Sequence, residues 1–268
     1  MKPFLRWAGG KNWLLKNIDK HLPQEIENYY EPFLGGGSVF FHLKSNNLIK
    51  NKSYLSDTNA DLINTYRTIK NNVEELISVL KDFENNEEFY YKIRQKIFDN
   101  EIENAAKFLY LNKTSFNGIY RVNSKGEYNV PYGKRNLKDL IEIENLFEVS
   151  NALKNTYFSI KDFKKIKKSI KEGDFIFFDP PYTVAHENNG FIHYNQSLFA
   201  WKNQIQLSNL LDEIKEKNAN FLITNAAHRS IYDLYENKGN LLTLSRSSTI
   251  GGKGAARTKY NEILLKNY

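Results

Sequence analysis

The chain has 268 residues, of which 41% are hydrophobic, and a formal net charge of +7. This length allows one large domain or a core domain with an insertion, and the positive charge suits a polyanionic partner. The absence of cysteine excludes disulfides, cysteine-bound zinc and thiol catalysis. Because the histidines show no ligand spacing and no apolar run reaches membrane length, we expect a cytoplasmic protein with neither metal nor membrane partner.

The first distinctive stretch is the turn Gly9-Gly10, followed by Lys11, which opens a predicted amphipathic helix through Leu14 and Ile18. A glycine turn with a lysine at the start of a helix can hold an anion. It is not a nucleotide-binding P-loop, because the spacing differs and neither serine nor threonine follows Lys11. An ordinary capped turn is the alternative interpretation.

Three more glycines, Gly35 to Gly37, lie between a predicted strand at Tyr30 and a predicted helix. Glycine lets the backbone approach a ligand that a Cβ atom would repel. The spacing is not the dinucleotide fingerprint, which argues for a smaller ligand. Asp57 ends the next predicted strand about 20 residues after Gly35, where an acidic residue typically binds ribose hydroxyls. Together these features predict an adenosine-containing cofactor.

The sequence from Asn59 to Lys81 is predicted to be helical in two pieces, with Asn72 and Glu75 resembling a capping box that starts the second piece. A further helix is predicted from Glu87 to Tyr110. No strand alternates with these helices, so the order of strands and helices typical of an α/β domain is interrupted. We therefore interpret residues 65–154 as a helical insertion in such a domain.

Within this insertion, an Asn-Ser-Lys-Gly turn between Tyr120 and Tyr128 predicts a hairpin. Basic, amide and aromatic side chains are interleaved around it, and these are the groups that contact base edges, phosphates and stacked bases. An ordinary surface hairpin is the alternative. We favour contact with DNA because so many of these residue types converge in one short stretch.

The apolar run from Phe175 to Phe178 predicts a buried strand, and Asp179-Pro180-Pro181-Tyr182 follows it directly. The two prolines end the strand and impose a rigid turn at its carboxyl end, where ligands bind in open α/β sheets. The Asp179 carboxylate and the Pro180 carbonyl are two acceptors that suit an exocyclic amino group, and Tyr182 can stack on a flat ring. A strand-ending turn without a ligand is the alternative.

The other predicted features complete an α/β pattern. They are a lysine-rich helix with a solvated face at Lys161–Lys171, a polar lid at Thr183–Ser197, an amphipathic helix at Trp201–Lys217, a buried strand at Asn220–Thr224, a hairpin joining Leu241–Leu244 to Glu262–Leu265, and a basic loop at Ser245–Lys259 between its strands. That loop can follow phosphates or be an ordinary exposed loop.

Five motifs in this order resemble the Dam-type DNA adenine-N6 methyltransferases, the D12 class in its alpha arrangement. They are Trp7 to Lys11, Glu31 to Ser38, Ser56 to Asn59, Phe116 to Gly133, and Asp179 to Tyr182. The resemblance covers nearly the whole chain and implies an α/β fold, with a Rossmann-like sheet of the S-adenosylmethionine-dependent methyltransferases and an inserted, mainly helical target-recognition domain. Residues 1–64 and 155–268 would form the catalytic domain, and residues 65–154 the DNA-binding domain.

The resemblance also implies roles for single residues. The positions that match contacts to S-adenosyl-L-methionine are Trp7, Lys11, Gly35, Gly37, Asp57 and Asp179. The catalytic positions are Asp179, Pro180 and Tyr182. The DNA-binding positions are Phe116, Asn117, Ile119, Arg121, Pro131 and Lys134, and we call Phe116–Lys134 the recognition segment. Arg121 matches an arginine that binds a guanine, while the loop after Tyr182 departs from the family pattern and no residue is assigned there.

The implied reaction is methyl transfer to N6 of an adenine flipped out of double-stranded DNA, in the sequence GATC, with a cognate restriction endonuclease as an open functional partner. A cytosine-N4 methyltransferase is the nearest alternative, since cytosine also carries an exocyclic amine. The aspartate before Pro180 favours adenine by family resemblance. A nicotinamide oxidoreductase lacks its glycine fingerprint here, and a DNA-binding protein without activity does not explain the full set of motifs.

Overall fold

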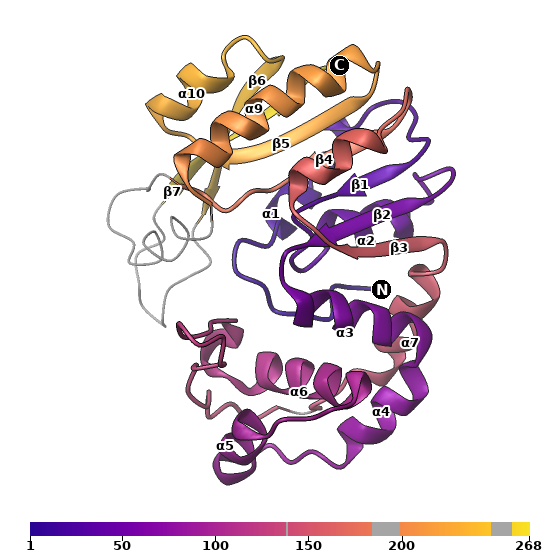
Figure 1. Cartoon of the computed structure of the whole chain (residues 1–268), viewed down its shortest axis with the longest axis vertical. Coiled ribbons are helices and arrows are strands. Elements are labelled where there is room, and N and C mark those ends of the chain that lie inside the picture. The colour runs from indigo at the N-terminus through magenta and orange to yellow at the C-terminus, as the bar shows by residue number, and fades with distance from the viewer. Residues whose placement is uncertain (138, 184–198, 248–258) are drawn as a thin grey trace. The chain divides into compact units, whose positions relative to one another are not determined.

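The computed structural model describes residues 1–137, 139–183, 199–247 and 259–268 (Figure 1). In these residues seven strands form one sheet in the order β3-β2-β1-β4-β5-β7-β6. The strands are β1 Tyr29–Glu31, β2 Ser53–Asp57, β3 Thr156–Ile160, β4 Phe175–Phe178, β5 Asn220–Ala226, β6 Asn240–Ser247 and β7 Lys259–Lys266. Strand β4 is parallel to β1 and β5, whereas β7 is antiparallel to β5 and β6. The predicted α/β fold is confirmed.

The described helices fall mainly between β2 and β3 and after β4. The α-helices are α1 Asn12–Leu15, α2 Ser38–Ser45, α3 Ala60–Asn71, α4 Val73–Lys81, α5 Glu87–Gln95, α6 Glu101–Thr114, α7 Ile143–Ala152, α9 Trp201–Glu216 and α10 Arg229–Tyr235. The 3₁₀ helices are η1 Ile18–His21, η2 Phe116–Gly118 and η3 Phe163–Lys168.

The chain divides into two compact units. Unit 1 comprises Met1–Asn12, Leu34–Leu48 and Leu55–Lys161, and unit 2 comprises Trp13–Phe33, Ile49–Tyr54 and Asp162–Tyr268. The predicted site residues are divided between the two units. The cofactor-binding residues other than Asp179, together with the recognition segment, belong to unit 1. The turn at Asp179 to Tyr182 belongs to unit 2.

Three helices of unit 1, α3, α5 and α6, begin where asparagine side chains cap them. Asn59 accepts a hydrogen bond from the Leu62 amide at 3.0 Å and so starts α3, and Asn86 and Asn100 cap α5 and α6 in the same way. The cap at Asn100 also explains why the predicted helix over Glu87–Tyr110 is two helices. Asn72 does separate α3 from α4, but its side chain makes no capping hydrogen bond, so the predicted capping box is wrong.

The helix predicted after Lys11 is shorter than expected. Helix α1 ends at Leu15, and a 3₁₀ turn follows at Ile18–His21. The lysine-rich helix is likewise the 3₁₀ helix η3, and its apolar residues Phe163 and Ile166 are buried. Short 3₁₀ turns let these apolar side chains reach the core without a longer helix.

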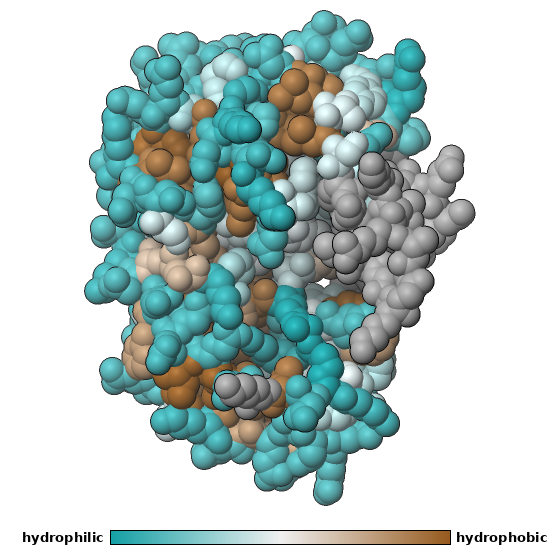
Figure 2. Space-filling model, turned by 180° about the vertical axis from the view of Figure 1, so that it is seen from behind, coloured by the Kyte–Doolittle hydropathy of each residue, from teal (hydrophilic) through white to brown (hydrophobic). Residues whose placement is uncertain are grey.

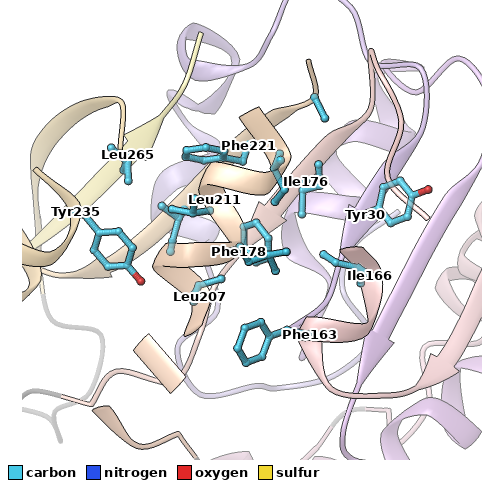
Figure 3. Close-up of a cluster of buried hydrophobic side chains, with 14 of the residues drawn as sticks. Tyr30, Phe163, Ile166, Ile176, Phe178, Leu207, Leu211, Phe221, Tyr235 and Leu265 are labelled. Carbon is cyan, nitrogen blue, oxygen red and sulfur yellow. The ribbon is translucent and has the colours of Figure 1, made fainter. Parts of the chain in front are cut away.

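The core of unit 2 surrounds β4 and β5 (Figure 3). Ile176 and Phe178 of β4 pack with Phe221 of β5 and with Leu207 and Leu211 of α9. All four residues of β4 are buried, so burial of apolar surface on both faces fixes the strand that carries Asp179 at its end. Figure 1 shows α9 running along β5 on one face of the sheet.

The face of the molecule in Figure 2 is largely hydrophilic, with hydrophobic areas separated from one another. No helix in the described ranges combines the length and the hydropathy needed to cross a bilayer. The predicted polar lid, apart from Thr183, and most of the predicted basic loop lie outside the described residues. The predicted tail hairpin is confirmed, because Leu241 pairs with Leu265 and Leu244 with Glu262.

Candidate functional site

In unit 1, the glycine turn Leu34–Gly37 lies next to Asp57 at the end of β2. The Gly35 amide donates to Asp57 Oδ2 at 3.2 Å, and the Asn59 amide donates to Oδ1 at 3.0 Å. Burial raises the pKa of the Asp57 carboxyl above its usual value, and hydrogen bonds from backbone amides partly oppose that rise. The glycine turn and Asp57, both predicted to bind one cofactor, are thus in direct contact.

The glycines of this turn make room for two aromatic side chains. Gly35 has a φ of +46°, and a Cβ atom there would lie 2.7 Å from Cδ1 of Trp7. Gly37 has a φ of +63°, and its Cβ would lie 2.8 Å from the hydroxyl of Tyr66. Tyr66 also donates to the Gly35 carbonyl at 3.2 Å. The glycines therefore permit close packing of Trp7 and Tyr66 against the turn.

Trp7 is one layer of an aromatic stack that reaches the recognition segment. Its ring centroid lies 5.5 Å from that of Tyr120 with the planes 22° apart, and 6.3 Å from that of Phe108. Tyr120 stands between Ile119 and Arg121, two of the predicted DNA-binding residues. The first sequence motif and the recognition segment are therefore in contact within unit 1.

Asn112, which the sequence analysis did not single out, joins the same two stretches. It is 1% exposed, and its amide accepts from the Arg6 amide at 2.9 Å and donates to the Arg6 and Gly118 carbonyls at 2.7 and 3.1 Å. Three hydrogen bonds from one buried side chain therefore fix the backbone at Arg6 and the backbone at Gly118. A buried asparagine inside an apolar helical pattern is the signal that could have indicated it.

Lys11 is almost completely buried, with 4% of its surface exposed, and its ammonium group donates to the Gly9 carbonyl at 2.8 Å. The Gly10 amide closes the preceding turn by donating to the Trp7 carbonyl at 3.2 Å. At Gly9, φ is +81° and a Cβ atom would meet nothing within 4 Å, so the turn borders open space. A buried ammonium beside such space suits an anionic group of a ligand.

The recognition segment is held by backbone pairing at its base. The Phe116 amide donates to the Pro131 carbonyl at 2.9 Å, and the Gly133 amide donates to the Thr114 carbonyl at 2.8 Å. The predicted hairpin is confirmed by the antiparallel bridge between Val122 and Tyr128. The segment thus carries its exposed side chains on a backbone with defined pairing.

The predicted DNA-binding side chains are mostly exposed. Phe116 is 53% exposed, and Asn117, next to it, has a left-handed φ of 56°. Arg121 donates through Nε to Asn129 Oδ1 at 2.8 Å, which orients the guanidinium group. Lys134 lies 3.3 Å from the Glu87 carboxylate in an exposed ion pair. Their contacts with DNA stay predictions.

In unit 2, Asp179 follows β4 directly, and the turn Asp179–Tyr182, which we call the Asp-Pro-Pro-Tyr turn, is held by side chains of β5 and β7. Thr224 of β5 donates its hydroxyl to Asp179 Oδ1 at 2.8 Å. Tyr182 donates its hydroxyl to Glu262 Oε2 of β7 at 2.6 Å. Burial, followed by the negative charges of Glu262 and Asp179, raises the pKa of Tyr182 well above its usual value, so this hydroxyl stays protonated.

A buried network holds the residue after this turn. Tyr235 and Asn225 both donate to Gln204 Oε1, at 2.9 and 3.1 Å, so the amide is oriented to donate through Nε2 to Thr183 Oγ1 at 3.2 Å. Gln204 and Asn225 are fully buried. Satisfied networks of this kind define a single arrangement of the groups that they connect.

Three partners of this turn, Thr224, Glu262 and Gln204, were not predicted from the sequence. They lie far from it in sequence, with separations of 45 residues for Thr224 and Asp179 and 80 for Glu262 and Tyr182. A glutamate directly before the apolar run Ile263 to Leu265 is the one local signal that could have indicated Glu262. Across the described part of the chain, no cluster of three or more His, Asp or Glu side chains could hold a metal ion.

Comparison with known proteins places this arrangement in a family. The family model of the D12 class N6 adenine-specific DNA methyltransferases matches residues 7–250. A type II methyltransferase of Lactococcus lactis subsp. cremoris is 34% identical over all of this chain and 96% of its own length. A type II methyltransferase of Methanocaldococcus jannaschii is 35% identical over all of this chain and 99% of its own length.

A third relative is the DNA adenine methylase of Escherichia coli K12, which is 29% identical over 98% of this chain and 94% of its own length. The family match decides between the alternatives that the sequence left open, in favour of adenine over cytosine and of methyl transfer over hydride transfer. The chain is an adenine-specific DNA methyltransferase that belongs to the D12 class N6 adenine-specific family.

Proposed function

We propose that this chain transfers the methyl group of S-adenosylmethionine to N6 of an adenine that is flipped out of duplex DNA. The observation that supports it most is the Asp-Pro-Pro-Tyr turn itself. A carboxylate held by Thr224, a rigid proline backbone and an aromatic ring come together at the carboxyl end of a buried parallel strand. These groups match the two amino hydrogens and the flat ring of adenine.

The residues of unit 1 suit the proposed cofactor. Asp57 presents a half-buried carboxylate beside the glycine turn, which is the acceptor that a pair of ribose hydroxyls needs. Trp7 offers an aromatic surface, and the buried Lys11 ammonium suits a carboxylate. We infer that these residues, with Gly35 and Gly37, hold S-adenosylmethionine. When bound, it supplies a methyl group already activated on a sulfonium sulfur.

The Asp-Pro-Pro-Tyr turn would then act on the base. Asp179 and the Pro180 carbonyl accept the two N6 hydrogens, which keeps electron density on a nitrogen whose lone pair otherwise spreads into the ring. N6 would become positive as it gains the methyl group and the methyl–sulfur bond breaks, and the Asp179 carboxylate would stabilise that charge and take the proton that N6 then loses. Tyr182 stacks on the adenine and offsets part of the few kcal/mol that flipping costs.

We further propose residues 65–154 as the DNA-binding domain and GATC as the recognised sequence. Arg121, oriented by Asn129, can bind a guanine through O6 and N7. Ile119 and Pro131 supply apolar contacts for thymine methyl groups, and Phe116 is exposed enough to fill the space that the adenine leaves. Asn117 and Lys134 would contact the neighbouring DNA. A cytoplasmic location and a cognate restriction endonuclease stay predictions.

The test is to incubate the pure protein with labelled S-adenosylmethionine and unmethylated plasmid DNA, and to sequence the product with detection of modified bases. We expect N6-methyladenine in GATC. N6-methyladenine in another sequence would overturn the proposed specificity and keep the proposed chemistry. Methylated cytosine, or no transfer by a folded protein that binds the cofactor, would overturn the chemistry.

A further inference from the structure

Thr224 faces Asp179 because of the register of the central sheet. Phe178 pairs with Ile223 in the parallel ladder of β4 and β5, so the next residue of each strand, Asp179 and Thr224, also come side by side. Ile223 packs into the core with α9, and alternation along the strand directs fully buried Thr224 to the opposite face. The 2.8 Å hydrogen bond to Asp179 Oδ1 is thus built into the strand pairing.

Glu262 projects from the same face of the sheet. It pairs with Ala226 of β5, two positions from the pairing of Thr224 with Leu264, so Thr224 and Glu262 share a face. Glu262 is 1% exposed and directly precedes the fully buried residues Ile263 to Leu265 of β7. A buried carboxylate costs several kcal/mol unless hydrogen bonds compensate it, and an apolar residue would serve a strand core better.

The partner of this carboxylate is the Tyr182 hydroxyl, at 2.6 Å. The raised pKa of Tyr182 keeps the hydroxyl protonated, so it is the donor in this hydrogen bond. Without a partner, the carboxylate torsion of an aspartate and the ring torsion of a tyrosine are both broad. Each of the two side chains that the proposed function uses is therefore held at its far end, Asp179 by a residue of β5 and Tyr182 by a residue of β7.

We propose that Thr224 and Glu262 are positioning residues for the methyl transfer: Thr224 fixes the rotation of the Asp179 carboxylate, and Glu262 fixes the ring of Tyr182. This rests on the proposed function, in which Asp179 accepts the N6 hydrogens and Tyr182 stacks on the adenine. Thr224 thereby acts on the chemical step. Glu262 acts on the retention of the flipped base.

The test for Thr224 uses two variants of the full chain, with unmethylated plasmid DNA and labelled S-adenosylmethionine. Thr224→Val keeps the shape and loses the hydroxyl, whereas Thr224→Ser keeps the hydroxyl. We expect Thr224→Val to lower the single-turnover rate by about 10- to 100-fold, as a misplaced catalytic group does, with the KM for DNA and the Kd for the cofactor within about twofold of the parent. Thr224→Ser should stay within about threefold.

A Thr224→Val enzyme that transfers methyl groups at the parent rate would overturn this role. So would a Thr224→Ser enzyme as slow as Thr224→Val, because the hydroxyl would then not be the feature that matters. Methyl transfer by the parent protein tests the proposed function separately. If it forms no N6-methyladenine, the proposed function fails; if it does and the variants keep its rate, only the positioning role fails.

The test for Glu262 compares Glu262→Gln, which keeps an oxygen acceptor for Tyr182, with Glu262→Leu, which removes it. The readout is the fluorescence of 2-aminopurine placed in a duplex at the adenine that sequencing shows to be methylated. We expect Glu262→Gln to give the parent signal on binding, and Glu262→Leu to change that signal and to raise the KM for DNA more than it lowers kcat.

Glu262→Gln alone keeps the inference testable if Glu262→Leu does not fold, because a changed signal in folded Glu262→Gln would contradict it. Tyr182→Phe removes the donor of the same hydrogen bond. Combined with Glu262→Leu, it should cause no further change in the fluorescence beyond that of Glu262→Leu alone. Additive changes would show that the two side chains act independently and would overturn the role of Glu262.

Discussion

The glycine turn of unit 1 and the Asp-Pro-Pro-Tyr turn of unit 2 both follow a strand, but different forces shape them. The glycine turn depends on absent side chains, because a Cβ atom at Gly35 or Gly37 would lie under 3 Å from Trp7 or Tyr66. The Asp-Pro-Pro-Tyr turn depends on side chains supplied from β5 and β7, by Thr224 and Glu262. The first constraint is local and steric, whereas the second comes from distant residues through hydrogen bonds.

The largest effect is expected at the second turn. Asp179→Ala should lower methyl transfer by at least about 100-fold, the scale seen when a group that stabilises transition-state charge is removed. Single-turnover rates on unmethylated plasmid DNA measure this loss, with circular dichroism to confirm the fold.

Asp174→Asn is the matched control at the other end of β4. Asp174 is fully buried and accepts hydrogen bonds from Asn28 and from the Lys171 amide, at 2.8 and 2.9 Å. Its substitution should lower the melting temperature and leave the rate per folded molecule close to that of the parent. If both variants lost the rate equally, a catalytic role for Asp179 would not be supported.

At the glycine turn, Gly37→Ala should destabilise the protein and weaken cofactor binding. The left-handed backbone alone costs an alanine about 1–2 kcal/mol, and the close approach to the Tyr66 hydroxyl adds to it. Gly126→Ala separates these two causes, since Gly126 has a φ of +79° but a Cβ there meets nothing within 4 Å. Urea unfolding should show the greater loss for Gly37→Ala, and equal losses would argue against the steric explanation.

The next prediction concerns the recognition segment and the DNA sequence that it selects. Arg121→Ala should reduce discrimination at one base pair of the site by about 1–3 kcal/mol, because a bidentate contact to guanine is lost. Lys125→Ala, at an exposed position near the tip of the same hairpin, should leave the sequence preference unchanged. Methylation rates on duplexes with single substitutions measure the preference, and an unchanged preference in Arg121→Ala would contradict the assignment.

The smallest predicted effect is a pH dependence from Asp57. Burial raises its pKa, so on acidification the carboxyl gains its proton at a higher pH than an exposed aspartate would. A protonated carboxyl offers fewer acceptors to ribose hydroxyls, so cofactor affinity should fall as the pH falls through this raised pKa. Asp57→Asn should bind the cofactor more weakly and without this dependence, as isothermal titration calorimetry at several pH values would show.

The raised pKa of Asp57 makes the stability of the protein fall as the pH rises, whereas it makes cofactor affinity rise. Since the folded pKa of Asp57 is raised, its contribution to stability is fully present below the pKa of the unfolded chain and is lost as the pH rises through the folded pKa. Asp57→Asn should therefore remove a small stability loss that the parent shows over that window. Urea unfolding of both proteins across the window checks the sign.

The features that the sequence predicted correctly are those with local causes. The buried run of β4 and the hairpin at Tyr120–Tyr128 follow from short patterns of apolar and turn residues. The spacing of one α/β repeat led to the glycine turn and Asp57 being assigned to one site, and they are in contact. The break of the predicted helix at Asn100 was missed because an asparagine cap competes with helix propensity.

The partners of the Asp-Pro-Pro-Tyr turn could not be predicted, because their position depends on strand register. Thr224 meets Asp179 only because β5 pairs with β4 at Phe178 and Ile223. Glu262 meets Tyr182 only because β7 pairs with β5 at Ala226. A shift of one residue in either ladder would direct these side chains to the other face of the sheet. No local pattern in the sequence encodes that choice.

The most direct test of the account titrates S-adenosylmethionine in single-turnover assays of Asp57→Ala and Asp179→Ala. We predict that Asp57→Ala regains a rate close to that of the parent once the cofactor saturates it, because Asp57 acts in binding. Asp179→Ala should stay slow at every cofactor concentration, because it lacks the group that acts on the adenine amine. A folded Asp179→Ala enzyme that recovers the parent rate at high cofactor concentration would contradict the account.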